Sequence, residues 1–404
     1  MFIQRHLEQT IRNATAAFPV VLVTGPRQVG KTTLLRTIAL AERTYVTLDN
    51  PAIRELAVND PALFLQRYQP PLIIDEIQYA PQLLPYIKMH VDEQRRKGDF
   101  WLIGSQMFHL MKNVGESLAG RVAIIPMQGL SHAELQGLSA DVYRTDEQAL
   151  LAKVHEAKKM TVREVFARIL KGSMPALYET EQDVELYYAS YVNSYLQRDI
   201  RELTQVGDEL AFLRFMTACA ARTGQLLNYA ELAKDVGVSA PTAKQWLSIM
   251  VSSGIVVLIE PYFNNALKRI VKSPRLYFMD TGLCAWLSRW TNADALEVSA
   301  MSGAFFETYV VSEIYKSYLN AGKRPPLFYY RDTDGKEIDL IIEQNDVLHP
   351  IEMKKTGAPK ANAIRHFSAL EKTGKTLGAG HVICVADDLL PIDRQNWIVP
   401  VWLI

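Results

Sequence analysis

One short stretch constrains the fold more than any other. Residues 25–32 read GPRQVGKT and fit the pattern GxxxxGK[ST] in full. They follow an apolar, β-branched run at 19–24 that is typical of a buried parallel strand, and they precede a helix-like segment at 31–40. A loop in this context turns its backbone N–H groups inward at the positive end of a helix, and so it cradles phosphates. The alternative is a glycine-rich turn that binds no ligand.

The residue types in this loop predict a role for each position. Gly25 and Gly30 let the backbone come close to a triphosphate, Lys31 reaches the β and γ phosphates, and Thr32 offers its hydroxyl to Mg²⁺. The sequence therefore predicts ATP and Mg²⁺ as cofactors.

A second apolar strand, in PPLIIDEIQ at 70–78, ends in two carboxylates, Asp75 and Glu76. In P-loop ATPases the aspartate holds Mg²⁺ and the following glutamate orients or deprotonates the attacking water. A strand that merely ends in polar residues is the alternative, but it explains an Asp-Glu pair less well than a single acid.

A third strand-like run, FWLIGSQ at 100–106, ends in Ser105 and Gln106, where a polar side chain could interact with the γ phosphate. Arg121 follows in ESLAGR and is a candidate arginine finger, from its own chain or from a neighbouring subunit; a surface arginine is an equally weighted alternative. Glu76, Lys31 and Arg121 are the predicted catalytic residues of this part. The predicted nucleotide-binding residues are Gly25, Pro26, Arg27, Gln28, Val29, Gly30, Lys31, Thr32, Thr33, Asp75 and Gln106.

These motifs, TGPRQVGKTTLL, LIIDEIQ, GSQ and LAGRV in this order, resemble the prokaryotic AAA+-type ATPases that carry a C-terminal winged-helix and nuclease-like region. The segment SYLQRDIREL at 194–203 is similar to the helical segment beyond the ATPase core of that family. The resemblance implies subunits that assemble into homo-oligomers, with sites formed between them.

Composition narrows the remaining classes. Lys plus Arg equals Asp plus Glu, 44 against 44, which argues against bulk coating of nucleic acid but allows a local basic groove. Three distant cysteines predict neither a disulfide scaffold nor a zinc site. The N-terminus lacks a signal core, and no run approaches the length that spans a bilayer, so we expect a cytoplasmic protein without membrane contact.

The middle of the chain has the spacing of a helix-turn-helix. A short helix at 229–234, a turn at 235–238 and a helix capped by Ser239 fit such a motif, and 254–270 could form its wing. In a DNA-reading version Thr242, Lys244 and Gln245 would face a groove, and Lys268 and Arg269 would contact phosphates. A packing or dimerisation module is at least as good a reading.

The last part carries four residues in a pattern that looks like the PD-(D/E)XK nuclease constellation. Glu307 lies on the apolar stripe of a helix, where an unpaired acid is costly. Asp339 lies on one strand, and Glu352 and Lys354 share a face of the next, with a turn near 344–346. Carboxylates suit Mg²⁺ or Mn²⁺, and Lys354 would stabilise developing charge. Ile338 stands where the pattern has proline, and a strand pair with surface ion pairs is the alternative.

The resulting fold class is a multidomain α/β protein with an N-terminal AAA+-type parallel sheet, a helical and winged-helix middle, and a C-terminal restriction-endonuclease-like domain. We expect the domains at 1–140, 141–205, 206–275 and 276–404. We expect an ATPase whose nucleotide state controls a nucleic-acid-directed module, with DNA as a candidate partner and a metal site at Glu307, Asp339 and Glu352. The rival is an ATP-driven switch or scaffold that cuts nothing. A small-molecule kinase would leave the C-terminal half unexplained.

Overall fold

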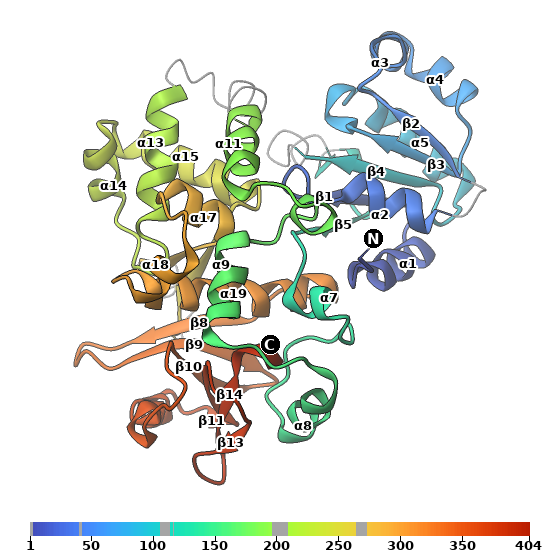
Figure 1. Cartoon of the computed structure of the whole chain (residues 1–404). Helices are drawn as coiled ribbons and strands as arrows, with labels where there is room; N and C mark the ends of the chain where they lie inside the picture. The colour runs from blue at the N-terminus through green and yellow to red at the C-terminus, as the bar shows by residue number, and fades with distance from the viewer. Residues whose placement is uncertain (1–2, 40–42, 106–113, 116, 196–208, 264–272) are drawn as a thin grey trace.

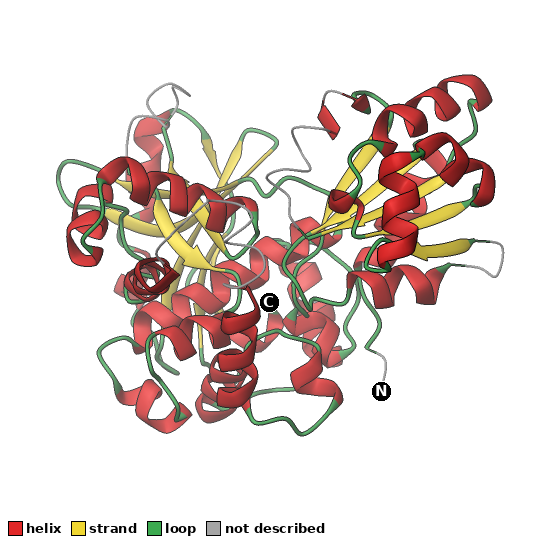
Figure 2. Cartoon of the chain, turned by 90° about the horizontal axis from the view of Figure 1, so that it is seen from above, coloured by secondary structure: helices red, strands yellow, loops and turns green. Residues whose placement is uncertain are grey.

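The computed structural model describes residues 3–39, 43–105, 114–115, 117–195, 209–263 and 273–404. Within these ranges the strands form two sheets, one of five strands and one of nine. Figure 1 shows the five-stranded sheet on one side of the molecule, the helices of the middle region beside it, and the larger sheet below them. In Figure 2, seen from above, helices flank the five-stranded sheet on both sides.

The N-terminal domain is a five-stranded parallel α/β sheet, as predicted, with strand order β2-β3-β4-β1-β5. Its strands are β1 (Val20–Thr24), β2 (Thr44–Thr47), β3 (Leu72–Asp75), β4 (Phe100–Gly104) and β5 (Val122–Pro126). Its helices are α1 (Leu7–Ala17), α2 (Lys31–Ile38), α3 (Pro51–Asn59), α4 (Pro61–Arg67), η1 (Ile77–Tyr79) and α5 (Leu83–Gln94).

The central strand β1 is buried along its whole length, which explains its unbroken apolar sequence. Val21 and Val23 join one hydrophobic core, whereas Val20 and Leu22 join another on the opposite face. Successive side chains of a strand point to opposite faces, so a run without polar residues suits a sheet that is covered on both sides.

The middle region contains two helices where the sequence predicts them, on either side of a short turn. Asn228 caps α14 (Tyr229–Val236), Gly237 ends it in the left-handed region, and the Ser239 side chain accepts from the Thr242 N–H to begin α15 (Ala240–Ser252). Among the described residues, α7 (His132–Gln136) closes the N-terminal domain, and the middle region also contains α8 (Glu147–Glu156), α9 (Val162–Lys171), α10 (Ala176–Glu179), α11 (Val184–Tyr195) and α13 (Glu209–Ala220).

The C-terminal sheet is mixed, with order β13-β14-β12-β10-β9-β8-β6-β7 and with β11 paired to β10. Its strands are β6 (Val256–Pro261), β7 (Arg275–Phe278), β8 (Leu327–Arg331), β9 (Glu337–Gln344), β10 (Val347–Lys354), β11 (Thr376–Leu377), β12 (Gly380–Cys384), β13 (Leu390–Pro391) and β14 (Asn396–Pro400). The other elements are α17 (Thr281–Leu287), α18 (Ala293–Val298), α19 (Ser302–Asn320), η3 (Ala361–Ile364), η4 (Phe367–Thr373) and η5 (Val401–Leu403).

This sheet crosses the domain boundary expected at 275/276. Strand β6, assigned to a wing by the sequence pattern, pairs antiparallel with β7 and parallel with β8. The described part of that segment therefore lies in the larger sheet, and its role as a wing of the helical region stays a prediction.

Contacts from α19 hold the N-terminal domain against the rest of the chain. Asn320 O accepts from Thr10 Oγ1 at 2.7 Å, a Glu313 carboxylate oxygen accepts from the His132 N–H at 2.7 Å, and Lys316 Nζ donates to Leu130 O at 2.9 Å. No helix in the described ranges is long and apolar enough to cross a membrane.

Candidate functional site

The glycine-rich loop lies at the carboxyl end of β1, and its backbone shows why glycine is needed. Gly25 has φ +135°, and a Cβ there would lie 2.0 Å from the backbone oxygen of Met127. Gly30, with φ +92°, begins α2 in the left-handed region. Side chains at these two positions would strain the loop or collide with the neighbouring strand end.

Lys31 and Thr32 open α2 and point toward the loop and the neighbouring strand. Lys31 is 8% exposed, and its Nζ donates to the carbonyl oxygens of Gly25 and Pro26 at 2.9 and 2.7 Å. Thr32 Oγ1 donates to Asp75 Oδ2 at 2.8 Å. The sequence motif thus brings its hydroxyl to the aspartate that ends β3, 43 residues away.

Asp75 and Glu76 follow one another but face different partners. Asp75 Oδ2 also accepts from the Tyr45 hydroxyl at 2.8 Å, and burial, reinforced by this aspartate, raises the pKa of Tyr45. Glu76 has φ +57°, and its carboxylate lies 3.7 Å from Arg27 Nη1 and within reach of the Gln78 amide and the Ser105 hydroxyl. Two adjacent acids therefore occupy separate environments, as their predicted separate roles require.

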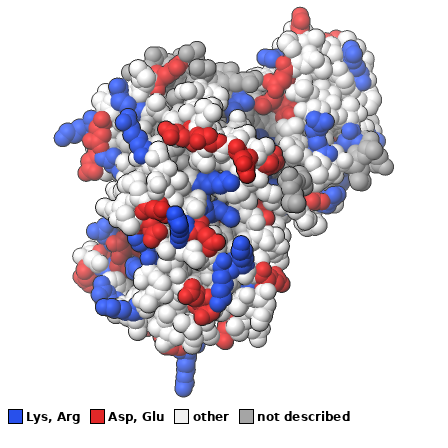
Figure 3. All heavy atoms as spheres, in the orientation of Figure 1, with Lys and Arg blue, Asp and Glu red and all other residues white. Residues whose placement is uncertain are grey.

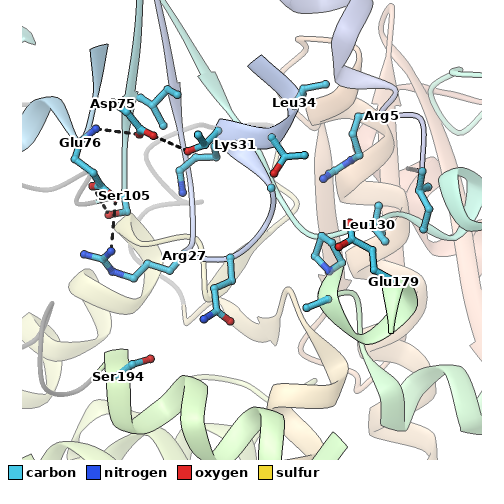
Figure 4. A pocket seen from close by; sticks show the side chains of 18 residues that line it. Arg5, Arg27, Lys31, Leu34, Asp75, Glu76, Ser105, Leu130, Glu179 and Ser194 are labelled. Atoms are coloured by element: carbon cyan, nitrogen blue, oxygen red, sulfur yellow. Dashed lines mark hydrogen bonds and ion pairs between the residues drawn. The ribbon is translucent and has the colours of Figure 1, made fainter. Parts of the chain in front are cut away.

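A cavity of about 450 Å³ opens onto this loop. In Figure 4, Asp75, Glu76 and Ser105 lie on one side of the loop, and Arg5, Leu130 and Glu179 lie on the other. The lining residues are Ile3, Arg5, Arg27, Gln28, Gly30, Lys31, Thr32, Thr33, Leu34, Asp75, Glu76, Ile103, Ser105, Leu130, Pro175, Ala176, Glu179 and Ser194. Most of the predicted nucleotide-binding residues thus face one space, although Pro26 and Val29 pack elsewhere.

Arg5 is a site residue that the sequence pattern did not reveal. It is 4% exposed, and it donates to Glu134 Oε1 at 3.0 Å, to Val29 O at 2.8 Å and to Gln128 O at 2.7 Å. Burial alone would raise the pKa of Glu134, but the Arg5 guanidinium and two backbone N–H groups hold it below its ordinary value. Arg5 therefore fastens the loop to the segment after β5.

Arg121 lies away from this cavity within its own chain. It comes immediately before β5, which runs parallel to β1. It therefore lies at the amino ends of these strands, opposite the end that carries the loop. Five strand residues separate the two ends by roughly 16 Å. Its guanidinium pairs with Asp92 at 2.5 and 2.9 Å. A role toward a neighbouring subunit stays a prediction, and Gln106 lies outside the described residues.

The four C-terminal residues do come together. Ile351 pairs with Leu340 across β9 and β10, so Asp339 and Glu352 follow at the same end of the strands. Lys354 Nζ lies 2.6 Å from Glu352 and 3.7 Å from Asp339, and the Met353 N–H donates to Asp339. Burial, with Asp339 nearby, raises the pKa of Glu307 and of Glu352 to about 7.

Arg275 lies inside the same cluster, although the sequence pattern did not connect it with the acids. Its Nη1 donates to Glu307 Oε1 at 2.9 Å and lies 3.9 Å from Asp339, and its Nη2 pairs with Glu337. The Tyr277 hydroxyl also donates to Glu307. Arg275 and Tyr277 are two residues apart on β7, and this alternation is the one signal that could have placed them on one face.

Comparisons with known proteins match three separate parts of the chain. Residues 17–136 match an AAA domain, whereas 162–294 and 302–404 match domains of unknown function (DUF8612 and DUF4143). The last match names no nuclease. A solved structure, the Walker-type ATPase paby2304 of Pyrococcus abyssi, is 13% identical over 71% of this chain and 96% of its own, with a TM-score of 0.40, too low to carry an argument.

Two relatives match over most of their length. They are the uncharacterized proteins Mb2031c of Mycobacterium bovis and Rv2008c of Mycobacterium tuberculosis. Each is 30% identical over 360 residues, which is 88% of this chain and 75% of the relative. The chain therefore belongs to the family of these mycobacterial proteins, and its N-terminal part is an AAA domain.

Proposed function

We propose that the chain binds and hydrolyses Mg²⁺-ATP and that its helical middle region responds to the nucleotide state. The observation that carries the first part is the Thr32 hydroxyl on the Asp75 carboxylate at 2.8 Å, with Glu76 beside them on the same cavity. A hydroxyl and a carboxylate oxygen are ligands that suit Mg²⁺. Thr32 and Asp75 would hold the ion, which neutralises phosphate charge when bound.

The polar end of the cavity suits the phosphates and the reacting water. Lys31 can exchange its two carbonyl partners for phosphate oxygens, since both arise within the loop that it spans. Glu76 faces the Ser105 hydroxyl and the Gln78 amide, two groups that can help fix its carboxylate. We assign Glu76 as the group that orients or deprotonates water.

The other end of the cavity suits the base. Leu130 lies on that side of the loop, and the apolar side chains on the lining as a whole are Ile3, Leu34, Ile103, Leu130, Pro175 and Ala176. Glu179, also on the lining, supplies a hydrogen-bond acceptor there. Arg5 lies on the same side of the loop as Glu179, so this end joins apolar side chains to two charged groups, a mixture that is usual in small-molecule sites.

Residues beyond the AAA domain touch the phosphate loop directly. The Tyr187 hydroxyl of α11 donates to Gln28 Oε1 at 2.7 Å, and Gln28 has φ +62°. Gly254, in the turn between α15 and β6, approaches the loop so closely that a Cβ there would lie 3.2 Å from Pro26 Cδ. We propose that a shift of the loop on nucleotide exchange moves α11 and this turn.

Replacing Tyr187 by phenylalanine tests that connection. The variant loses one hydrogen bond to the loop, a contact worth about 0.5–1.5 kcal/mol, so we expect KM for ATP to change by about 2- to 10-fold. Tyr86→Phe, at a 38% exposed tyrosine of α5, is the matched control. Equal steady-state kinetics for the two variants would show that α11 does not sense the loop through this bond.

A second candidate function is metal-dependent cleavage of DNA by the C-terminal domain. The convergence of Glu307, Asp339, Glu352 and Lys354 favours it, whereas Arg275 within the cluster counts against it. On the face shown in Figure 3, basic and acidic side chains alternate over the described residues instead of gathering into a basic stripe. DNA contact by Thr242, Lys244 and Gln245 stays a prediction, and Lys268 and Arg269 lie outside the described residues.

The two candidate functions separate in one assay. Purified protein is incubated with Mg²⁺-ATP, with and without linear double-stranded DNA, and the same samples are assayed for phosphate release and run on a gel. We expect phosphate release with the DNA left intact. Fragmented DNA that Asp339→Ala protects would establish the nuclease instead.

A further inference from the structure

We infer that the Arg275 guanidinium takes the place of a metal ion in the C-terminal acid cluster. The nuclease-like pattern implies a divalent cation held by Glu307, Asp339 and Glu352. In the part of the chain that the structure describes, no group of three or more His, Cys, Asp or Glu side chains is placed to hold a metal. The residues present do not fit the ion, and the reason is visible in the contacts of Arg275.

The two acids that a shared metal would join already share a cation. The same Nη1 of Arg275 donates to Glu307 at 2.9 Å and lies 3.9 Å from Asp339. A magnesium ion needs oxygens at about 2.0–2.1 Å in near-octahedral geometry. The guanidinium instead offers five N–H donors in a fixed plane, so carboxylates gather around it at hydrogen-bond distance.

The other acids of the cluster also have cationic partners. Glu337 pairs with Nη2 of Arg275, and Glu352 pairs with Lys354 at 2.6 Å. Asp339 lies between the two cations, with one oxygen toward Arg275 and the other toward Lys354 and the Met353 N–H. Each carboxylate that the pattern assigns to a metal is thus held by a side chain of the protein.

Arg275 is a buried residue of the sheet and not a surface side chain. It is 6% exposed, it begins β7, and its guanidinium lies over the Tyr329 ring at 5.1 Å. The Tyr329 hydroxyl in turn donates to Ser273 O at 2.6 Å, two residues before Arg275. Moving the guanidinium out would leave the partly buried carboxylates of Glu307 and Asp339 without this cation, which is costly, so we expect it to stay in the cluster.

A titration of the full-length, nucleotide-free protein with Mn²⁺ tests this inference. Electron paramagnetic resonance measures the Mn²⁺ that stays free. The wild type is expected to show no Mn²⁺ binding that depends on Asp339, so Asp339→Asn should bind as much Mn²⁺ as the wild type. Arg275→Gln keeps hydrogen-bonding groups but removes the charge, and we expect it to gain at least about tenfold in Mn²⁺ affinity at a site that a second change, Asp339→Asn, abolishes. Arg275→Lys retains the charge and should resemble the wild type.

Two results would overturn the inference. One is wild-type Mn²⁺ binding that depends on Asp339, a measurement that does not require any Arg275 variant to fold. The other is a folded Arg275→Gln protein, judged by its circular dichroism and thermal unfolding midpoint, that gains no Asp339-dependent binding.

Discussion

Replacing Lys31 by alanine is expected to lower ATP hydrolysis by about 100-fold or more, the size of effect seen when one preorganised donor to a transition state is lost. Lys31 Nζ donates to two loop carbonyls, and Lys31 lines the cavity in which we place the phosphates. The measurement is phosphate release at saturating Mg²⁺-ATP. ATP affinity, followed with a fluorescent analogue, should weaken in the same variant.

The control for this prediction is Lys97→Ala, at an exposed lysine outside the cavity. It removes the same charge and should hydrolyse ATP at the wild-type rate. Hydrolysis that survives Lys31→Ala unchanged would show that the chemistry takes place elsewhere in the chain or in a contaminant.

Replacing Glu76 by glutamine separates binding from turnover. The amide keeps the size of the side chain but cannot take a proton from water, so we expect hydrolysis to fall by about 10² to 10⁴-fold, the usual contribution of a general base. Binding should persist, because Lys31, Thr32 and Asp75 are untouched. Single-turnover hydrolysis and nucleotide binding are measured on one preparation.

Glu55→Gln, at an exposed acid of α3, is the matched control and should keep full activity. If Glu76→Gln bound no ATP, the glutamate would have to be assigned to binding instead of to water activation.

The phosphate loop could be predicted from sequence because its determinants are local. Gly25, Gly30 and Lys31 act within one strand-loop-helix unit, and the two acids come at the end of a strand that must join the same sheet. The cap of α15 at Ser239 was predictable for the same reason. In each case one short segment contains both the residue and the physical cause of its conformation.

The role of Arg121 was harder to predict because it depends on strand direction. A residue that precedes a parallel strand lies at the amino ends of the strands, whereas the phosphate loop lies at their carboxyl ends. Arg121 follows the other motifs in the sequence but is therefore far from them in space. Arg5 and Tyr187 were missed for another reason. Each reaches the loop from a distant segment, 24 and 159 residues away in the chain, through a contact that leaves no periodic mark.

The C-terminal cluster shows both outcomes side by side. Alternation along β9 and β10 correctly put Asp339, Glu352 and Lys354 on shared faces. The strand that delivers Arg275 enters the sheet from the other side of β8, through β6, so its arginine could not be assigned to the acids from the sequence alone. Arg275 therefore reaches the acids through the order of the strands in the sheet, which the local sequence does not reveal.

Hydrogen exchange of the full-length Glu76→Gln variant, with ATP and with ADP, tests most directly whether the middle region responds to the nucleotide. ATP is expected to change exchange in residues 25–33 and also in α10, α11 and the turn at 253–255, where Tyr187 and Gly254 meet the loop. Changes confined to the five-stranded domain, with equal exchange elsewhere, would contradict it.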